Sequence, residues 1–432
     1  MPTSGREPAS HHGMSAYRST CLIVAALGCL LLAPPLAAKE SNGTAAARAL
    51  FAQGDALARA GKAVEAAALF RKAITADPDF VDAHQRFIES TQRAEAPASR
   101  TSAVLRLQHQ YKRWAAQQPK RAVYQWALGF LSPEPDKSEP YFLAALEIDP
   151  SFARAHFLLA RNADLRGDWD AQRRHLAAAV ECNPDDPRYL MKYALAYKRS
   201  DAARFRELAS AVVQKFPESQ AAAEALYHLA DSASNPERRS LFEQMRLKYP
   251  ADKFGYGSLA MSDFYGEITV PSEALSVARE MAKAFPASRT WARRVALQDA
   301  MTRAAALIAD RNFVEALEVL EKSERPSDAH VTTWALLKAE AAAGAGQGER
   351  AYTSLVESAA AAPDARVEAA LVRHGTALNK NAREIDADVW RVRDASAKPA
   401  PAFELAGDRA TSPVQLSDYR GRVVLIAFWF PG

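Results

Sequence analysis

Cysteine side chains could give this chain redox or nucleophilic chemistry, and the sequence has three of them. Cys21 and Cys29 lie in an apolar N-terminal stretch, so Cys182 is the single thiol in the rest of the chain. One thiol cannot form an intramolecular disulfide. Because Cys182 stands at an expected helix end, just before Asn183-Pro184, we interpret it as a small packing residue. An intermolecular disulfide is the alternative.

Histidines could bind a metal or act as general bases, and the chain has nine. His11 and His12 fall in the N-terminal leader, where a tail is a better interpretation than a metal site. The others are His84, His109, His156, His175, His228, His330 and His374. They do not cluster with carboxylates at the spacing of metal ligands, and no Ser–His–Asp arrangement can be argued. We therefore predict no catalytic, cofactor-binding or metal-binding residue.

A glycine-rich stretch, Gly344-Ala345-Gly346-Gln347-Gly348, could suggest a phosphate-binding loop. Such a loop needs a preceding strand and a Lys-Ser or Lys-Thr pair after its last glycine. Here Glu349-Arg350 follows, and the flanking alanine-rich runs favour helix. The stretch is therefore predicted to be the turn between two helices.

The C-terminal stretch from Lys398 to Gly432 differs from the rest of the chain. It opens with Lys398-Pro399-Ala400-Pro401, which is typical of an extended linker. Short strands are then predicted at 402–405 and 414–416, with a turn at 406–408 and a tight bend at 417–421. The eight apolar residues from Val423 to Phe430 are typical of a strand buried on both faces of a sheet.

This stretch resembles the start of the redoxin branch of the thioredoxin-fold superfamily. The matching residues are Pro401-Ala402-Phe403, Leu416-Ser417-Asp418-Tyr419-Arg420-Gly421, Val423-Val424-Leu425-Ile426 and Phe428-Trp429. The resemblance implies an α/β thioredoxin fold with thiol–disulfide exchange or peroxide reduction, and a thiol or disulfide redox partner. The nucleophilic cysteine of that family would come just after Gly432, so no residue here takes that role. A chance resemblance of a generic buried strand is the alternative.

The first 38 residues are predicted to be a secretory signal peptide. Arg18 supplies a positive charge, Cys21–Leu32 is an apolar core too short to span a bilayer, and Leu36-Ala37-Ala38 offers a cleavage site. The prediction places the protein in the bacterial periplasm, with no stable membrane span after cleavage. An uncleaved membrane anchor is the alternative, and either Met1 or Met14 could be the start.

Residues 47–80 resemble a tetratricopeptide repeat, a unit of two antiparallel helices. The matching positions are Gly54, Leu57, Gly61, Ala66, Phe70, Ala73 and Pro78. Small residues at 54, 66 and 73 let the two helices approach closely, while Leu57 and Phe70 fill the space between them. Gly61 makes the turn and Pro78 stops the second helix.

Proline stop signals recur along residues 39–394 at nearly constant spacing. They are Pro78, Pro150, Pro184, Pro217, Pro250, Pro286 and Pro363. Between four of them the intervals are 184−150 = 34, 217−184 = 33 and 250−217 = 33. This period predicts an α-solenoid of about nine units, with degenerate repeats or longer loops at 85–120 and 250–275. Trp169 is expected in a turn as a packing aromatic.

The surface of the solenoid is expected to bind a protein or peptide partner. Five aromatic residues on first helices are candidates for the binding groove, although packing inside the repeat is the favoured interpretation for most of them. They are Tyr124, Tyr193, Tyr197, Tyr227 and His228. The net charge of +4 comes from 55 basic and 51 acidic residues that are interspersed, so nucleic-acid binding is not expected.

The sequence thus predicts a mainly α protein: a tetratricopeptide α-solenoid followed by an incomplete α/β thioredoxin-fold segment. The predicted parts are a signal peptide (1–38), the solenoid (39–394), a linker (395–401) and the start of a redoxin domain (402–432). The predicted function is a redoxin carried on a scaffold, in a chain that stops before its redox cysteines and suggests an incomplete gene model. A non-enzymatic extracytoplasmic adaptor is the alternative.

Overall fold

The structure is a computed structural model that describes residues 41–398, 400–405 and 413–427. The predicted signal peptide, with Cys21 and Cys29, lies outside these ranges, as do the predicted turn at 406–408 and residues 428–432. Across the described ranges the chain forms twenty α-helices and two short strands, as the prediction of a mainly α protein required.

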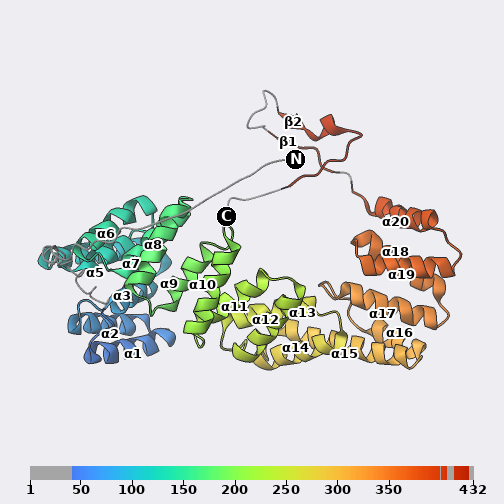
Figure 1. Cartoon of the computed structure of the whole chain (residues 1–432), viewed down its shortest axis with the longest axis horizontal. Helices are drawn as coiled ribbons and strands as arrows, with labels where there is room; N and C mark the ends of the chain where they lie inside the picture. Colours follow the sequence, from blue (N-terminus) through green and yellow to red (C-terminus); the bar gives the residue numbers. More distant parts are fainter. Residues whose placement is uncertain (1–40, 399, 406–412, 428–432) are drawn as a thin grey trace, which may run out of the picture. The chain divides into compact units, whose positions relative to one another are not determined.

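The helices follow one another in pairs, and their contacts divide the chain after Pro217 into two units. In the first unit, drawn blue to green in Figure 1, each pair packs as a hairpin with a short connection, and a 3₁₀ turn at Pro97–Ser99 precedes α4. The pairs are α1 (Ala45–Arg59) with α2 (Ala63–Ala76), α3 (Val81–Ala94) with α4 (Arg100–Gln117), α5 (Ala122–Phe130) with α6 (Pro135–Ile148), α7 (Ala153–Leu165) with α8 (Trp169–Cys182), and α9 (Pro187–Leu195) with α10 (Ala202–Lys215).

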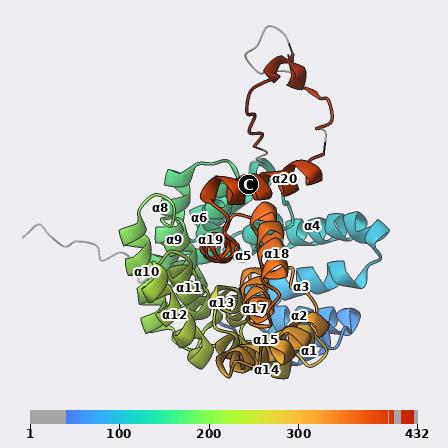
Figure 2. The same ribbon diagram turned by 90° about the vertical axis from the view of Figure 1, so that its right-hand side faces the viewer.

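The second unit has the same construction. Its pairs are α11 (Gln220–Asp231) with α12 (Asn235–Lys248), α13 (Gly255–Glu267) with α14 (Pro271–Ala284), α15 (Arg289–Ala309) with α16 (Phe313–Lys322), α17 (Val331–Gly344) with α18 (Gly348–Ala361), and α19 (Ala365–Ala377) with α20 (Ala382–Ser396). Figure 2 shows α17 and α18 side by side from a second direction. The described residues therefore contain ten pairs, one more than expected, because residues 81–117 and 255–284 form full pairs.

The predicted stop prolines end helices as expected. Each of the seven stands two residues after the last residue of a second helix, as Pro78 does after α2 and Pro184 after α8. A proline disfavours helical backbone in the residue before it, so the helix ends there and the chain turns into the next pair. Asp186, Ser219 and Asp364 then cap the start of the following helix by accepting a backbone N–H bond.

In five of the ten described pairs, the turn between the two helices contains a residue with positive φ. Gly61, Gly167 and Gly346 take this position, at φ +78°, +72° and +79°. Gly346 lies between α17 and α18, so the glycine-rich stretch is a turn, as predicted. Arg311 (φ 62°) and Asn379 (φ 61°) take the corresponding position in two pairs of the second unit.

The core of each unit lies between the helices of its pairs. Phe70 and Ala66 of α2 are fully buried against α1, where a Cβ added to Gly54 would come within 2.9 Å of the Phe70 ring. This is the close approach predicted for the repeat at residues 47–80. Ala73 is also buried, and Leu57 packs against the same core.

The segment after α20 forms the two short strands predicted for it but not the long one. β1 (Glu404–Leu405) pairs antiparallel with β2 (Val414–Gln415), and a 3₁₀ turn at Leu416–Tyr419 follows. Residues 423–427, the described part of the predicted buried strand, are irregular, and Val423 and Leu425 are 102% and 94% exposed. An apolar run forms a strand only where another strand pairs with it, and none does so in the described residues.

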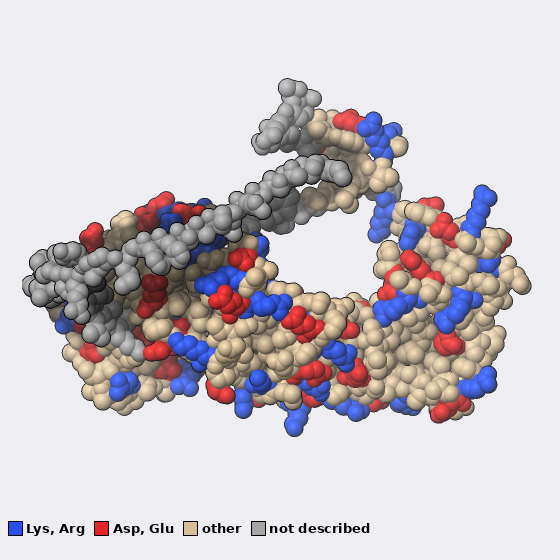
Figure 3. All heavy atoms as spheres, viewed as in Figure 1, with Lys and Arg blue, Asp and Glu red and all other residues tan. Residues whose placement is uncertain are grey.

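Charged side chains of both signs mix over the face shown in Figure 3. Ion pairs join many of them, for example Arg246 with Glu280 and Arg239 with Glu273 between α12 and α14. In the described part of the chain, no helix has the length and apolar character needed to cross a membrane.

Candidate functional site

The five groove candidates take three different positions. Tyr124 is only 3% exposed and packs among aromatic rings of the first unit, 5.7 Å from His84 and 5.8 Å from Trp114 between centroids. It is a core residue, as the packing interpretation predicted. Tyr193 and Tyr197 are half-buried, with rings 5.4 Å apart and hydroxyls 3.4 Å apart.

Tyr227 and His228 contribute to a larger group on the second unit, which we call the aromatic–acid cluster. It consists of Tyr227, His228, Tyr256, Glu224 and Asp263, contributed by α11 and α13. The Tyr227 ring centroid lies 5.4 Å from both His228 and Tyr256, and the latter two are 5.7 Å apart. All three rings are half-buried, so part of each faces solvent. α11 and α13 are the first helices of successive pairs, where the repeat pattern places a partner surface.

Each tyrosine of the cluster is tied to a carboxylate on the other helix. The Tyr227 hydroxyl donates to Asp263 at 2.8 Å, and the Tyr256 hydroxyl donates to Glu224 at 3.1 Å. Burial, followed by the bond to Asp263, raises the pKa of Tyr227 to about 12. Burial and then the charge of Glu224 also raise the pKa of Tyr256. Both phenols therefore stay protonated at neutral pH, and the cluster presents ring faces beside negative charge.

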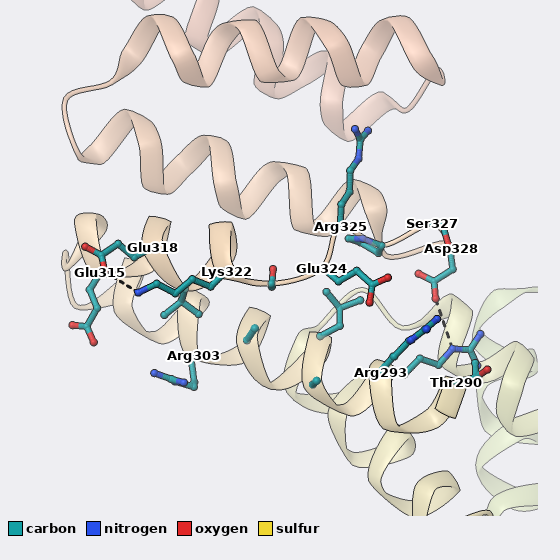
Figure 4. A pocket seen from close by; sticks show the side chains of 17 residues that line it. Thr290, Arg293, Arg303, Glu315, Glu318, Lys322, Glu324, Arg325, Ser327 and Asp328 are labelled. Carbon is teal, nitrogen blue, oxygen red and sulfur yellow. Dashed lines mark hydrogen bonds and ion pairs between the residues drawn. The ribbon is translucent and has the colours of Figure 1, made fainter. Parts of the chain in front are cut away.

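A cavity of about 680 Å³ lies in the same unit. It forms because α15 has 21 residues and α16 only 10, so the connection at 323–328 passes over α15 where no second helix covers it. Ala296, Leu297, Ala300 and Val319 provide its apolar lining. Figure 4 places Arg303, Glu315, Glu318 and Lys322 at one end and Arg293, Glu324 and Asp328 at the other.

Charges of both signs line this cavity, and two pairs neutralise each other. Lys322 is 3.3 Å from Glu318, and Arg294 is 3.7 Å from Asp328. The Arg294 guanidinium also lies over two rings, 4.4 Å from the Trp291 centroid and 4.6 Å from that of Tyr265. A site for phosphate would need a clear excess of positive charge, and the nearly balanced charges of this lining do not provide it.

Two other residues singled out in the sequence are Cys182 and Trp169, and only the first lies where it was predicted. Cys182 is half-buried beside the small cluster of Ala153, Ala179 and Tyr189, as the packing interpretation predicted. Trp169 begins α8 and is 53% exposed, so the prediction of a packing aromatic is wrong. It is the first residue of α8, and its ring lies beside the turn at Gly167, 3.9 Å from where a Cβ on that glycine would stand.

Two histidines that are far apart in the sequence lie next to each other in the structure. His156 of α7 and His175 of α8 come together, with their Nδ1 atoms 3.2 Å apart. Among the described residues, however, no group of three or more His, Cys, Asp or Glu side chains is placed to hold a metal ion. Sequence spacing missed this pair, and it missed Tyr256 and Asp263, because such contacts depend on how each helix is rotated about its axis.

No protein-family model matches this chain, and no curated protein matches it. Among solved structures it is similar to a thermophilic TPR protein from Thermus thermophilus, at 16% identity over 43% of this chain and 99% of that one, with a TM-score of 0.33. It is also similar to a tetratricopeptide repeat protein from Parabacteroides merdae, at 11% identity over 76% and 98%, with a TM-score of 0.29. A third match is the APC/C hetero-tetramer Cut9–Hcn1, at 13% identity over 75% and 55%, with a TM-score of 0.35. The described part of the chain is a helical-repeat fold of successive antiparallel helix pairs, and that conclusion rests on its own helices.

The redoxin function predicted from the C-terminal segment is wrong. The titles of the first two structures above name tetratricopeptide repeat proteins, and none of the three titles names a redox enzyme. The central strand on which the resemblance depended is not formed where the structure describes it, since residues 423–427 are irregular and solvent-exposed. The finding favours the alternative of an adaptor.

Proposed function

We propose that this protein is a non-enzymatic tetratricopeptide adaptor and that it binds a basic segment of a protein partner at the aromatic–acid cluster. One observation carries the proposal: the half-buried rings of Tyr227, His228 and Tyr256 meet beside Asp263 and Glu224 on the first helices of two successive pairs. No enzymatic step is part of the proposal.

The chemistry of the cluster favours a cation. A Lys or Arg side chain over an aromatic face gains roughly 0.5–2 kcal/mol, and a nearby carboxylate adds attraction. Asp263 and Glu224 accept hydrogen bonds from the two phenols, and each places a carboxylate beside the rings. Those two bonds also fix the tyrosine rings before the partner arrives, which lowers the entropy cost of binding.

We propose further that the adaptor works outside the cytoplasm. The support is the leader-like stretch with Arg18 and the apolar core Cys21–Leu32. The division into a signal peptide (1–38), solenoid (39–394), linker (395–401) and separate C-terminal segment (402–432) belongs to the same proposal.

A displayed peptide library selected against the full chain tests the binding site. We expect the selected peptides to be enriched in Lys and Arg, and to bind at least ten-fold more weakly to a Tyr227→Ala/Tyr256→Ala variant. Trp390→Ala is the matched control, because Trp390 is an exposed aromatic residue on α20 that lies outside the cluster. Circular dichroism melts would verify that each variant is folded.

A second variant tests whether the negative charge of Asp263, rather than the shape of its side chain, contributes to peptide binding. Asp263→Asn keeps an oxygen that accepts the Tyr227 hydrogen bond but removes the negative charge. It should weaken peptide binding at low salt and make binding less sensitive to added salt. Selection of acidic or uncharged peptides, or equal binding by the Tyr227→Ala/Tyr256→Ala variant, would overturn the proposal.

A further inference from the structure

Two histidines of the first unit face each other through the same ring nitrogen. His156 lies on α7 and His175 on α8, the two helices of one pair. Their Nδ1 atoms are 3.2 Å apart, and their ring centroids are 5.5 Å apart at an interplanar angle of 35°. Both side chains are half-buried, so each keeps part of its surface in contact with solvent.

The tautomer of His156 is set by the end of the preceding helix pair. Its Nε2 lies 3.3 Å from the carbonyl oxygen of Pro150, which can only accept a hydrogen bond. Nε2 therefore carries the hydrogen, and Nδ1 points a lone pair at His175. A metal-binding histidine is usually oriented in this way, with its second ring nitrogen donating to a backbone carbonyl.

We propose that His156 and His175 bind a divalent transition metal ion, such as Zn²⁺, Ni²⁺ or Cu²⁺, between their Nδ1 atoms. A tetrahedral ion with metal–nitrogen bonds of about 2.0–2.1 Å sets its two nitrogen ligands about 3.3 Å apart. The observed separation of 3.2 Å is close to that value. In the metal-free pair the His175 Nδ1 carries the hydrogen shared with His156. Binding moves that proton to Nε2 of His175 through solvent, so the net charge of the pair does not change.

The charges around the pair are compatible with a cation. Burial lowers the pKa of both histidines, which keeps them in the neutral form that binds a metal. The charge of Glu181 acts against this lowering at His156, and the charges of Glu139 and Asp168 do so at His175, whereas Arg174 lowers the pKa of His175 further. Arg166 is ion-paired with Glu139.

The two histidines supply only part of a metal ion's coordination. Because the described residues offer no third side chain, water must complete the coordination. By the general order of affinities among divalent metals, we expect Cu²⁺ to bind more tightly than Ni²⁺ or Zn²⁺.

The test uses the full chain with His11→Gln and His12→Gln in every sample, because adjacent histidines in the N-terminal stretch can also bind metal. Electron paramagnetic resonance of one equivalent of Cu²⁺ should show coupling to two imidazole nitrogens. His156→Gln and His175→Gln should each weaken binding at least ten-fold. His109→Gln, which changes an exposed histidine of α4, should leave binding unchanged.

A second measurement needs no variant of the pair. Zn²⁺ at 0.1 mM should protect His156 and His175, but not His109, from chemical modification by diethyl pyrocarbonate. Equal Cu²⁺ binding by the wild type and the His156→Gln variant would overturn the site, and so would the absence of protection. This inference is independent of the proposed adaptor function, since a peptide at the aromatic–acid cluster does not involve these histidines.

Discussion

The Nε2 atom of His84 lies 2.9 Å from the carbonyl oxygen of Pro78, six residues earlier in the chain. Its Nδ1 is 2.9 Å from the Tyr111 hydroxyl, so both ring nitrogens of this fully buried histidine are satisfied. The same relationship recurs between His156 and Pro150, again six residues apart. In both places a histidine near the start of a pair's first helix forms a hydrogen bond, through Nε2, with the carbonyl oxygen of the proline that follows the preceding pair.

The buried His84 should make the first unit sensitive to acid. Burial lowers its pKa from 6.5 to about 4. Above pH 6.5 both the native and unfolded forms are neutral. As the pH falls from 6.5 towards 4, only the unfolded state gains a proton, so native stability is lost across this window, by up to roughly 3 kcal/mol.

Urea unfolding at pH 7.5 and pH 4.5 measures this effect. His84→Gln should be less stable than the wild type at pH 7.5 but should lose less stability on going to pH 4.5. His109→Gln is the control, because His109 is exposed on α4, and it should keep the pH dependence of the wild type. The same pH dependence in the wild type and His84→Gln would contradict the prediction.

The close approach of Gly344 to Phe313 predicts that Gly344→Ala lowers stability by itself but much less when it is combined with Phe313→Leu. A Cβ at Gly344 would lie 2.3 Å from two atoms of the Phe313 ring. Gly344→Ala should therefore destabilise the second unit by about 1–3 kcal/mol. Phe313→Leu should restore most of that loss in the double variant, because a smaller side chain leaves room for the methyl group.

Denaturant unfolding of the four proteins in a double-mutant cycle checks this pair. Strictly additive effects of Gly344→Ala and Phe313→Leu would show that the helices do not meet at these two residues.

The positive φ of Arg311 predicts a stabilising mutation. Arg311 takes the left-handed conformation at φ 62° in the turn between α15 and α16, where other pairs use glycine. This conformation strains a residue with a Cβ by roughly 1–2 kcal/mol, so Arg311→Gly should raise stability by about 0.5–1 kcal/mol. Arg303→Gly, at an exposed position inside α15, should lower it by about 1 kcal/mol. Melting temperatures of both variants test the prediction, and a loss of stability in Arg311→Gly would contradict it.

Asp388 of α20 holds together three side chains of the last two pairs. It accepts from the Tyr352 hydroxyl at 2.8 Å, and it pairs with Lys380 at 3.0 Å and Arg391 at 2.7 Å. Asp388→Ala leaves the Tyr352 hydroxyl without its acceptor, so it should cost about 1–3 kcal/mol. Asp386→Ala, one half-turn away at an exposed position, is the matched control and should change stability by less than about 0.5 kcal/mol. Equal effects in chemical unfolding would contradict the prediction.

The positions of helix ends and turns could be predicted because they depend on single residues. Pro184 and Pro217 restrict the backbone just before them, and Gly61 and Gly346 adopt the positive φ that a tight turn requires. These effects are local and need no knowledge of neighbouring helices. The period of 33–34 residues then follows from repeating them.

Contacts between helices could not be predicted in the same way. Tyr227 was a candidate from its place on a first helix, but its partners Tyr256 and Asp263 depend on how α13 is rotated against α11. His156 and His175 are separated by a turn and meet for the same reason. The apolar run at Val423 was misinterpreted because burial of a strand depends on neighbours that the sequence pattern does not reveal.

The ordering of the helix pairs also has a consequence for how the chain acquires its structure. In every substantial helix–helix contact, the two helices are adjacent or next but one in chain order. Loop closure between such neighbours costs little entropy, so each pair can pack as soon as the next one has been synthesised. We expect folding to proceed from the N-terminus while the ribosome is still translating, with no need to wait for distant segments. Mechanical unfolding from one end would then release the protein pair by pair rather than in a single cooperative step.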